Sequence, residues 1–520
     1  MSTPSEKLAE SLEILHKLQN ANGAAAIRAR DLTRTHRERL LKNGFLREVM
    51  KGWYIAGGPD EAKSESTAWY ASFWRFAAVY LESRFRKNWS LSAEQSLSIH
   101  AGNWTVPKQL AVRSPKGTNS VTKLPHGTSL FDLQAALPPA ADRTEKDGLR
   151  LFSLEAALIE ASPRYFLNHA TDARVALAMI RDASDPLGRL LDGGHSTIAG
   201  RLAGAFRNSG RASLADEIIA AMTAAGYQMR ESDPFSDQPV MALAPRETSP
   251  YVNRIRILWQ KMRGPVIEVF PKAPGLPRKP GAYIKGVEEA YVTDAYHSLS
   301  IEGYRVTPEL IQRVRRGIWN PDTNDADRER RDAMAARGYW QAFQFVKRSI
   351  GRVLKRENPG TFVEEDHRAW YREMFAPSVT AGLLKASDLA GYRNGQVFIR
   401  NSMHVPLNKE AVRDAMPAFF DLLRGEEHPA VRVVLGHFVF VYIHPYMDGN
   451  GRVARFLMNT MMAAGGYPWT VIPLSERKVY MSALEKASVD EDIAPFAEFN
   501  AKLVSDRLAG APLPAVPKPD

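Results

Sequence analysis

The stretch HPYMDGNGRVAR, residues 444–455, combines a histidine, an acid, two glycines on either side of an asparagine, and two arginines. It follows directly on the apolar run VVLGHFVFVYI, residues 433–443, whose length together with the preceding residues favours a buried helix. That helix should end at His444, because proline disfavours helical conformation in the residue before it. Beyond the loop, apolar residues recur at helical spacing, so we expect a second helix from Arg452 to Ala463.

The DGNGR part of this stretch lies at the start of the second expected helix. Free backbone N–H groups and the helix dipole attract anions there, and glycine lets the backbone wrap closely around phosphate oxygens. Asp448 is an oxygen ligand of the kind that Mg²⁺ uses when it bridges phosphates. The residues predicted to hold the phosphates are Gly449, Asn450, Gly451, Arg452 and Arg455.

His444 stands at the mouth of this predicted phosphate site. With an ordinary pKa of about 6.5, a histidine is mostly neutral at cellular pH and can accept a proton. Together these groups can bind a nucleoside triphosphate with Mg²⁺ and deprotonate an incoming hydroxyl, which describes nucleotidyl transfer. The alternative, a glycine turn between two helices, explains the glycines but not the histidine, the aspartate and the paired arginines.

The stretch resembles the motif HPFxxGNGRxxR of the Fic (filamentation-induced-by-cAMP) family at every position except Tyr446, which replaces a phenylalanine. The resemblance covers roughly residues 283–505 and implies a helical Fic domain. It implies protein adenylylation, in which His444 activates a Ser, Thr or Tyr hydroxyl of a protein, this chain included, for attack on ATP. His437 matches a helix histidine of the family, but its apolar surroundings favour a core residue.

The segment LAGYRNGQVFIRNSMHVPL, residues 389–407, resembles the flap of the same family, a β-hairpin. Its expected strands are residues 397–399 and 404–406, around an Asn401-Ser402 turn. In the family, the edge of this hairpin holds the target segment beside the nucleotide by β-augmentation. The corresponding residues here are Val397, Phe398 and Ile399. The alternative is a hairpin with a structural role alone.

A second motif lies in YHSLSIEGY, residues 296–304, where Ser298, Glu302 and Gly303 match the family's inhibitory pattern [S/T]xxxE[G/N] in the class II arrangement. The residues themselves predict a helix that ends at Gly303 with a glutamate in its last turn, where the dipole disfavours negative charge. The resemblance supplies Arg455 as the compensating cation. Glu302 would then occupy the place of the ATP γ-phosphate and autoinhibit the enzyme. A surface glutamate before a capping glycine is the alternative.

Residues 1–58 are predicted to form a winged helix-turn-helix domain. Helical spacing over residues 5–20, a short helix Ala24–Arg30 and a third helix opened by a Thr35–Glu38 capping box precede two strands around a Lys51-Gly52 turn. The segment resembles the N-terminal winged helix of AbiE-type antitoxin regulators.

Basic residues outnumber acids between residues 28 and 51, which is typical of a DNA groove reader. The alternative is a solvated face of a protein-interaction domain. The basic residues are Arg28, Arg30, Arg34, Arg37, Arg39, Lys42, Arg47 and Lys51, against Asp31, Glu38 and Glu48.

The rest of the chain divides into four predicted segments. Residues 59–265 form an α-rich accessory domain without assigned chemistry, and prolines spaced by three mark a semi-rigid linker at 266–282. The Fic domain with its inhibitory helix spans 283–508, and a proline-rich disordered tail spans 509–520. The predicted fold class is therefore mainly α: a helical Fic domain with a β-hairpin flap, behind a winged helix and an α-rich middle domain.

Composition limits the compartment and the chemistry. The chain has 520 residues, carries 69 Lys and Arg against 58 Asp and Glu, and contains no cysteine, which excludes disulfides, thiolate metal sites and cysteine nucleophiles. The N-terminus lacks the apolar segment of a signal peptide, and no apolar run approaches the roughly 20 residues that a bilayer demands. We expect a cytoplasmic protein without a membrane partner.

Two other functions remain open at this level. On the same fold, some family members remove AMP, with the inhibitory glutamate placing a water, or transfer UMP or another phosphate-bearing group. Alternatively, the chain is a transcription regulator or antitoxin-type protein that binds DNA through its N-terminal domain. The oligomeric state is likewise open, with a homodimer as one alternative.

Overall fold

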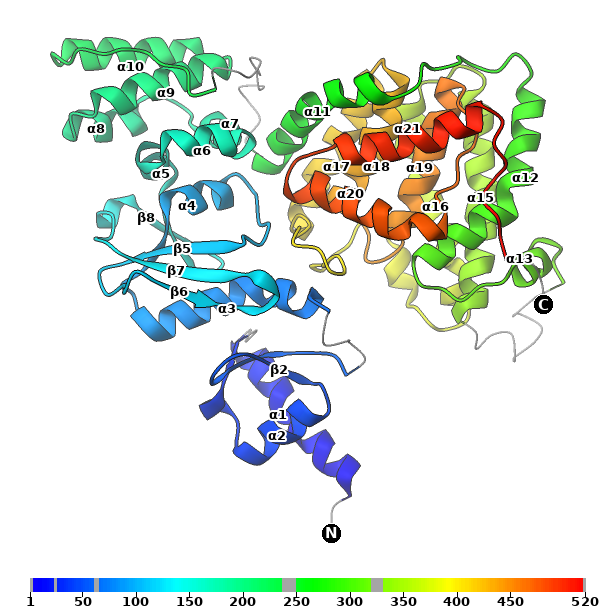
Figure 1. The fold of residues 1–520 in the computed structure, drawn as a ribbon, viewed down its shortest axis with the longest axis horizontal. Helices are drawn as coiled ribbons and strands as arrows, with labels where there is room; N and C mark the ends of the chain where they lie inside the picture. Colours follow the sequence, from blue (N-terminus) through cyan, green and yellow to red (C-terminus); the bar gives the residue numbers. More distant parts are fainter. Residues whose placement is uncertain (1–2, 23–25, 60–64, 236–248, 319–330, 518–520) are drawn as a thin grey trace. The chain divides into compact units, whose positions relative to one another are not determined.

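The computed structural model describes residues 3–22, 26–59, 65–235, 249–318 and 331–517. The chain forms two compact units (Figure 1). Unit 1 contains Met1–Arg254 with Phe398–Val405, and unit 2 contains Ile255–Val397 with Pro406–Asp520. Helices dominate both units, so the predicted mainly α fold class is confirmed. Within the described ranges, no helix is long and apolar enough to cross a membrane.

The N-terminal part of unit 1 is a three-stranded antiparallel sheet, in the order β1-β3-β2, with two helices and a 3-10 turn. The predicted hairpin around Lys51-Gly52 is confirmed. The predicted helix Ala24–Arg30 is wrong where it is described, because Ile27 and Arg28 pair with β3. Its first residues, 24 and 25, lie outside the described residues. The elements are α1 (Pro4–Asn22), β1 (Ile27–Arg28), η1 (Ala29–Asp31), α2 (Arg34–Lys42), β2 (Leu46–Met50) and β3 (Trp53–Ala56).

Helix α2 begins two residues earlier than the predicted capping box implied. The hydroxyl of Thr33, not of Thr35, accepts the backbone N–H of His36 and caps the helix. Glu38, the expected partner of a Thr35 cap, instead forms an ion pair with Arg34, with Nε and Oε1 2.6 Å apart. The predicted third helix therefore exists, but a different threonine starts it.

The remainder of unit 1 contains more β-structure than the α-rich prediction for residues 59–265 implied. A mixed sheet in the order β4-β5-β7-β6, in which β5 and β7 are parallel, precedes a β8-β9 hairpin. Helices α3 and α4 lie among these strands, and the described elements that follow β9 in this unit are helices. The elements up to that point are α3 (Thr67–Phe85), β4 (Ser90–Leu91), α4 (Ala93–His100), β5 (Gln109–Ser114), β6 (Ser120–Lys123), β7 (Ser129–Gln134), β8 (Arg143–Lys146) and β9 (Leu149–Phe152). The helices that follow are α5 (Leu154–Glu160), α6 (Pro163–Asn168), α7 (Ala170–Met179), α8 (Ser184–Asp192), α9 (Ser196–Asn208) and α10 (Ala212–Ala224).

Unit 2 is a helical bundle. Helices α18 and α19, which flank the HPYMDGNGRVAR stretch, pack against each other, and nearly all of α18 is buried. This confirms the two predicted helices, although α19 starts at Asn450 rather than at Arg452. The helices are α11 (Pro250–Val269), α12 (Pro280–Ile301), α13 (Pro308–Arg315), α15 (Arg331–Val353), α16 (Pro359–Thr380), α17 (Lys409–Gly425), α18 (Pro429–Ile443), α19 (Asn450–Gly465), α20 (Arg477–Val489) and α21 (Ala494–Leu508).

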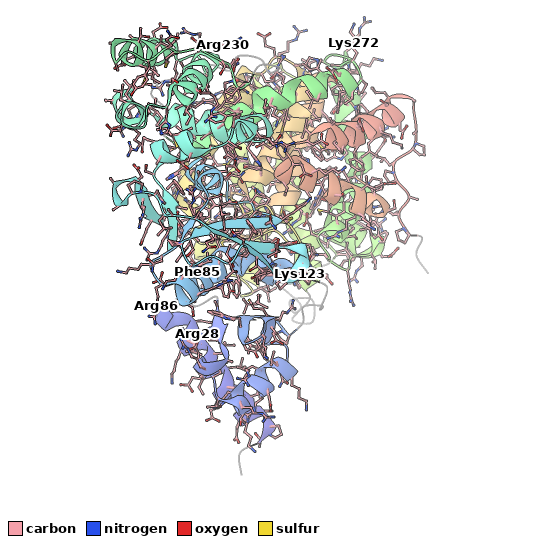
Figure 2. All side chains as sticks on the ribbon, turned by 60° about the vertical axis from the view of Figure 1, so that its left-hand side comes forward. Arg28, Phe85, Arg86, Lys123, Arg230 and Lys272 are labelled. Atoms are coloured by element: carbon pink, nitrogen blue, oxygen red, sulfur yellow. The ribbon has the colours of Figure 1, made fainter. Side chains whose placement is uncertain are left out.

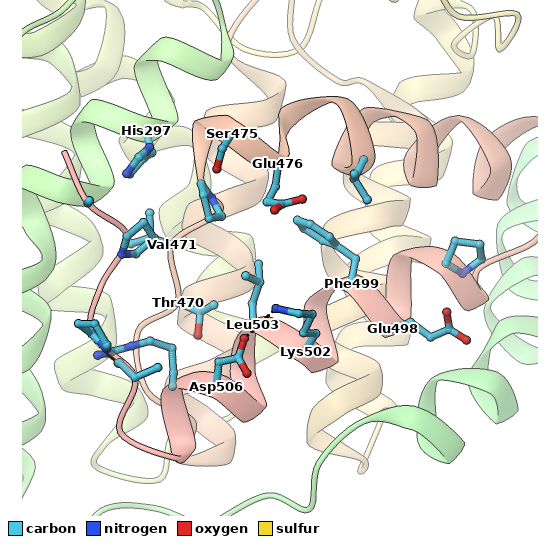
Figure 3. A pocket seen from close by; sticks show the side chains of 18 residues that line it. His297, Thr470, Val471, Ser475, Glu476, Glu498, Phe499, Lys502, Leu503 and Asp506 are labelled. Carbon is cyan, nitrogen blue, oxygen red and sulfur yellow. Dashed lines mark hydrogen bonds and ion pairs between the residues drawn. The ribbon is translucent and has the colours of Figure 1, made fainter. Parts of the chain in front are cut away.

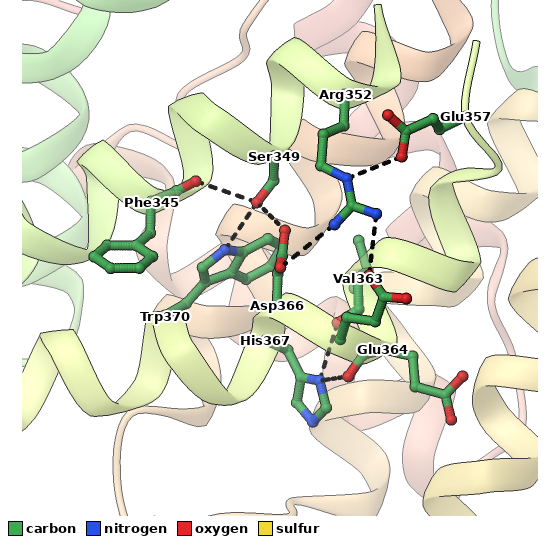
Figure 4. Close-up of polar contacts among 10 residues, drawn as sticks. Phe345, Ser349, Arg352, Glu357, Val363, Glu364, Asp366, His367 and Trp370 are labelled. Carbon is green, nitrogen blue, oxygen red and sulfur yellow. Dashed lines mark hydrogen bonds and ion pairs between the residues drawn. The ribbon is translucent and has the colours of Figure 1, made fainter. Parts of the chain in front are cut away.

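Side-chain hydrogen bonds join α15 to α16 in this bundle (Figure 4). The indole N–H of Trp370 donates to Ser349 Oγ at 3.2 Å, and that hydroxyl donates to Asp366 Oδ2 at 2.7 Å. One turn away, His367 Nδ1 bonds the carbonyl oxygen of Val363 at 2.9 Å. These contacts hold α16, whose next turn includes Tyr371, which stacks on Tyr446 of the loop between α18 and α19.

The proline-rich segment before α12 is packed onto unit 2 rather than spanning open space. Tyr467 donates its hydroxyl to the carbonyl of Pro271 at 2.7 Å, and the Gly275 N–H donates to the Gly465 carbonyl at 3.0 Å. The prolines thus shape a segment that is held against the end of α19. Helix α11 runs to Val269 and α12 begins at Pro280, so the segment between them is shorter than the predicted linker at 266–282, whose stiffness stays a prediction.

Candidate active site

His444 terminates α18 in a left-handed backbone conformation, with φ 55° and ψ 61°. Its Nδ1 lies 3.2 Å from the carbonyl oxygen of Val441. Because a carbonyl can only accept, Nδ1 carries the hydrogen and Nε2 keeps its lone pair. Burial of the ring is the main cause that lowers the pKa of His444 to about 4. His444 is therefore a neutral base with an open acceptor nitrogen.

Arg393 holds the backbone of this histidine in place, a role that the sequence did not reveal. Its Nε donates to the carbonyl of His444 at 2.8 Å, and its backbone N–H donates to the carbonyl of Pro445 at 2.9 Å. The two other guanidinium nitrogens donate to the carbonyls of Gly395, at 2.9 Å, and Leu407. Burial lowers the pKa of Arg393 to about 10, which still leaves it charged at neutral pH. The left-handed turn at His444 is thus fixed from outside its own helix.

Tyr446, the one departure from the family motif, is a buried anchor for the loop. Its ring stacks on Tyr371 of α16, with centroids 3.8 Å apart. The side chain of Asn450 clamps the same residue, since it accepts the Tyr446 N–H at 2.9 Å and donates to the Tyr446 carbonyl at 2.8 Å. The side chain of Asn450 therefore holds the loop in shape. The predicted donation of Asn450 to a phosphate would come from its backbone N–H.

Two glycines at the start of α19 are required by close neighbours. Gly449 has φ 80°, and a Cβ there would lie 2.7 Å from the ring of Phe375. A Cβ on Gly451 would lie 2.4 Å from Glu302 Oε1. The first glycine makes the turn into the helix, and the second lets a carboxylate approach the helix N-terminus.

Arg452 and Asp448 lie next to each other at this N-terminus. The guanidinium of Arg452 is buried between the rings of Tyr304 and Phe375, at 5.0 and 4.9 Å from their centroids. Its Nη2 lies 3.3 Å from Asp448 Oδ2, and the Asp448 side chain is 62% exposed. Among the described residues, no group of three or more His, Cys, Asp or Glu side chains could hold a metal. Asp448 thus fits a metal whose other ligands are phosphate oxygens and water.

The predicted pair between the inhibitory motif and the helix arginine is formed. Arg455 Nη2 donates to Glu302 Oε1 at 2.7 Å, and Nε donates to Ser298 Oγ at 2.8 Å. Gly303, with φ 89°, ends the helix as expected. Burial acts to lower the pKa of Arg455, but the neighbouring groups, with Glu302 first among them, together outweigh burial and raise that pKa above its ordinary value.

Both arginines keep a buried nitrogen that no described residue bonds. These atoms are Nη1 of Arg455 and Nε of Arg452. The first would lie 3.2 Å from a Cβ placed on Gly451, so it borders the N-terminus of α19. Donors in this position, next to a helix N-terminus, are available to an anion.

The predicted flap strands are wrong. Residues 397–399 and 404–406 form no strand, although a turn with Asn401 at φ 56° joins them. The segment Phe398–Val405 belongs to unit 1, where Asn401 Oδ1 accepts the N–H of Ser66 at 3.0 Å and the N–H of Val106 donates to the Met403 carbonyl at 2.9 Å. Its polar backbone groups thus find partners outside a hairpin ladder. Val397 is buried, and Phe398 is 38% exposed.

His437 is a core residue, as its apolar surroundings predicted. It is fully buried, and its Nε2 bonds the hydroxyl of Tyr480 at 2.8 Å. Burial lowers its pKa to about 3, so it stays neutral.

Comparison with known proteins agrees with this geometry. Residues 362–462 match the Fic/DOC family. "Protein adenylyltransferase Fic" of Nematostella vectensis is 29% identical over 265 residues, which are 50% of this chain and 57% of that protein. The protein of the same name from Drosophila willistoni is 31% identical over 225 residues, which are 42% of this chain and 41% of that protein. The chain thus spans about half the length of the curated relatives it matches.

Solved structures with Fic domains are also similar. The structure of Fic-1 (aa134–508) from C. elegans is 17% identical, with a TM-score of 0.38, and the match covers 69% of this chain and 90% of that one. A Fic domain containing signaling protein from Bacteroides thetaiotaomicron is 18% identical, with a TM-score of 0.32, over 50% of this chain and 95% of that one.

Proposed function

We propose that this chain, whose residues 362–462 match the Fic/DOC family, is a protein adenylyltransferase that moves AMP from ATP to a Ser, Thr or Tyr hydroxyl. One observation carries the proposal. A neutral histidine with an open Nε2 is joined by a short loop to a helix N-terminus whose buried arginines keep unbonded donors. Such a site binds a polyphosphate and accepts a proton from the group that attacks it.

The reaction follows from these positions. The hydroxyl gives its proton to His444 Nε2, and its oxygen forms a bond to the α-phosphorus of ATP. The bond from the α-phosphorus to the bridging oxygen breaks, and pyrophosphate leaves with the electron pair. The N–H groups at Gly449–Gly451, together with Arg452 and Arg455, stabilise the charge that develops on the phosphates.

Autoinhibition by Glu302 is part of the proposal. The Glu302 carboxylate occupies one face of Arg455, and only a glycine at 451 leaves it room. A γ-phosphate carries the same charge and competes for the same guanidinium. ATP therefore binds the resting enzyme in a pose unsuited to in-line attack.

The experiment that tests the function is mass spectrometry after incubation with a panel of nucleotides. Intact mass and peptide mapping of the purified protein should show an added AMP, on itself or on a co-purified protein. A different nucleotide adduct would assign another donor to the same fold. Release of AMP from a modified protein, without any transfer, would favour the AMP-removing alternative.

Asp448 is proposed to help hold Mg²⁺, which would neutralise phosphate charge when bound. Asp448→Ala should therefore abolish Mg²⁺-dependent labelling in a Glu302→Gly background. Because the side chain is exposed, thermal stability should change by no more than about 0.5 kcal/mol, which a melting curve can check. Asp388→Ala, at another acid of unit 2, serves as the control. Unchanged labelling in Asp448→Ala would remove this residue from the mechanism.

A second function, duplex DNA binding by the N-terminal part of unit 1, is favoured by its strand order β1-β3-β2 beside α2. A three-stranded sheet beside a helix is part of a winged-helix arrangement and supports this second function, which stays a prediction. Most of the eight basic residues nevertheless bond to other groups of the protein. Arg28, at the surface in Figure 2, pairs with Asp31, and Arg37 donates to the Ala29 carbonyl at 3.0 Å. The others with local partners are Arg34, Arg39 and Arg47.

Besides Arg34, which pairs with Glu38, the exposed basic residues of this surface are Arg30, Lys42 and Lys51. If they alone neutralise phosphates, the slope of log affinity against log salt should be about −2.7, since each phosphate contributes about −0.9. Fluorescence anisotropy with a labelled duplex measures it. Lys42→Glu should lower affinity, whereas Lys355→Glu, an equal charge change in unit 2, should not. A chain that shows no salt-dependent shift at low ionic strength would contradict DNA binding.

A cytoplasmic location and a homodimer stay predictions from the sequence. Sedimentation of the purified chain at several concentrations would decide the oligomeric state.

A further inference from the structure

A cavity of about 750 Å³ in unit 2 borders the inhibitory end of α12 (Figure 3). His297, the residue directly before Ser298 of the inhibitory motif, lines one side of the cavity. Another wall is the chain after α21, with Pro512, Pro514 and Ala515. We call residues 509–517 the C-terminal strap. The cavity thus brings the end of the described chain next to the helix that carries Glu302.

The C-terminal strap is held in place, which corrects the prediction of a disordered tail over residues 509–517. The backbone N–H of Ala511 donates to the Asp506 carbonyl at 2.9 Å, and the Arg507 guanidinium donates to the Ala511 carbonyl. Prolines fix their own backbone φ, so an ordered conformation costs this segment less entropy than it would cost other residues. Residues 518–520 lie outside the described residues.

His297 of α12 lies beside the strap at this cavity. Its Nδ1 accepts the backbone N–H of Leu474 at 3.1 Å, so the ring's hydrogen is on Nε2. The ring is buried, and this burial lowers its pKa, while the backbone of Pro514 and Ala515 acts in the opposite direction. Pro514 and Ala515 line the same cavity as His297, and they lie on the side of Nε2, the one ring nitrogen that can donate. Among the described residues Nε2 has no hydrogen-bond partner, so the strap lies beside the ring without a direct bond to it.

The last turn of α12 has one more partner besides Arg455. Arg477 Nε donates to the carbonyl of Ile301 at 2.7 Å, one of the carbonyls that a helix end leaves without an internal partner. Leu474 and Arg477 belong to the same short segment at the start of α20. This segment holds the end of α12 by hydrogen bonds, and the strap lies beside His297 of the same helix.

We propose that the C-terminal strap is a brace that keeps Glu302 aligned with Arg455, so that displacing the strap relieves inhibition. This inference rests on the proposed function and names its regulation. Helix ends open locally far more easily than whole domains unfold, and the frequency of opening follows the contacts made there. Removing the contacts at His297 raises the fraction of time in which Arg455 is open to a phosphate.

The test uses the whole chain with a stop codon at position 511. We expect faster hydrogen exchange over residues 294–303 and about fivefold more self-labelling from α-³²P-ATP, the change that about 1 kcal/mol produces. Added to Glu302→Gly, the truncation should give no further rise. A chain that ends at Pro517 is the matched control and should behave as the full chain does.

The outcomes separate the two proposals. If Glu302→Gly labels itself while the truncated chain keeps the exchange and labelling of the full chain, the brace is refuted and the function stands. If Glu302→Gly does not label, the proposed function fails, and hydrogen exchange alone still decides whether the strap holds α12. Should truncation impair folding, Pro512→Gly with Pro514→Gly loosens the strap at full length, and unchanged exchange in that variant overturns the brace.

Discussion

Glu302→Gly is expected to raise self-labelling from α-³²P-ATP by about 10- to 100-fold, the range that a hydrogen bond to a charged group contributes. The reason is the 2.7 Å contact of Glu302 Oε1 with Arg455 Nη2, which ends when the carboxylate is removed. The wild-type protein should be nearly silent in the same assay. Glu289→Ala is the matched control, because it removes an exposed carboxylate from the same helix.

Adding Arg455→Ala to Glu302→Gly should cancel the gain. Residues that share one contact are strongly non-additive, and here the freed arginine is itself the group that binds the phosphate. An equally silent Glu302→Gly protein that folds and binds ATP would refute autoinhibition. Weight would then move to the AMP-removing reaction, in which Glu302 is needed for the chemistry.

His444→Ala in the Glu302→Gly background is expected to lower labelling by about 10²- to 10⁴-fold, the usual contribution of a general base. ATP affinity, measured by calorimetry, should be unchanged, since Arg452, Arg455 and the α19 N-terminus remain. A loss of ATP binding of similar size would show that the histidine holds the nucleotide instead of taking the proton.

The pH dependence gives the same base a second readout. Only neutral His444 can accept a proton, and burial lowers its pKa to about 4. Labelling should therefore be level through neutral pH and should fall only as the pH approaches about 4. A fall centred near pH 6.5 would mean that the ring behaves as an exposed histidine.

The sequence predicted those parts of the site that depend on local patterns. Pro445 indicated the end of α18, and the glycines around Asn450 indicated the start of α19. The motif around Glu302 predicted the pair with Arg455. Each of these rests on residues close together in the chain or on a resemblance between short motifs. Local preference and tertiary structure agree there, so the sequence sufficed.

The features that were missed depend on residues far apart in the sequence. The flap segment bonds its backbone to Thr67 and Val106, and no ladder forms between residues 397–399 and 404–406. The strap lies beside His297, more than 200 residues earlier in the chain. The mixed sheet around β5 and β7 likewise arises from pairing that a single-sequence pattern did not show. For the flap segment and the mixed sheet, hydrogen bonds between residues far apart in the sequence decided between local alternatives.

The guanidinium of Arg393 donates to the carbonyl oxygens of Gly395, Leu407 and His444. These contacts depend on the backbone and not on the side chains at those positions. Every residue type has such a carbonyl. Side-chain substitutions between positions 395 and 407 are therefore expected to leave the backbone of His444 where it is. Under the proposed function, the proposed base would keep its position while the neighbouring side chains vary.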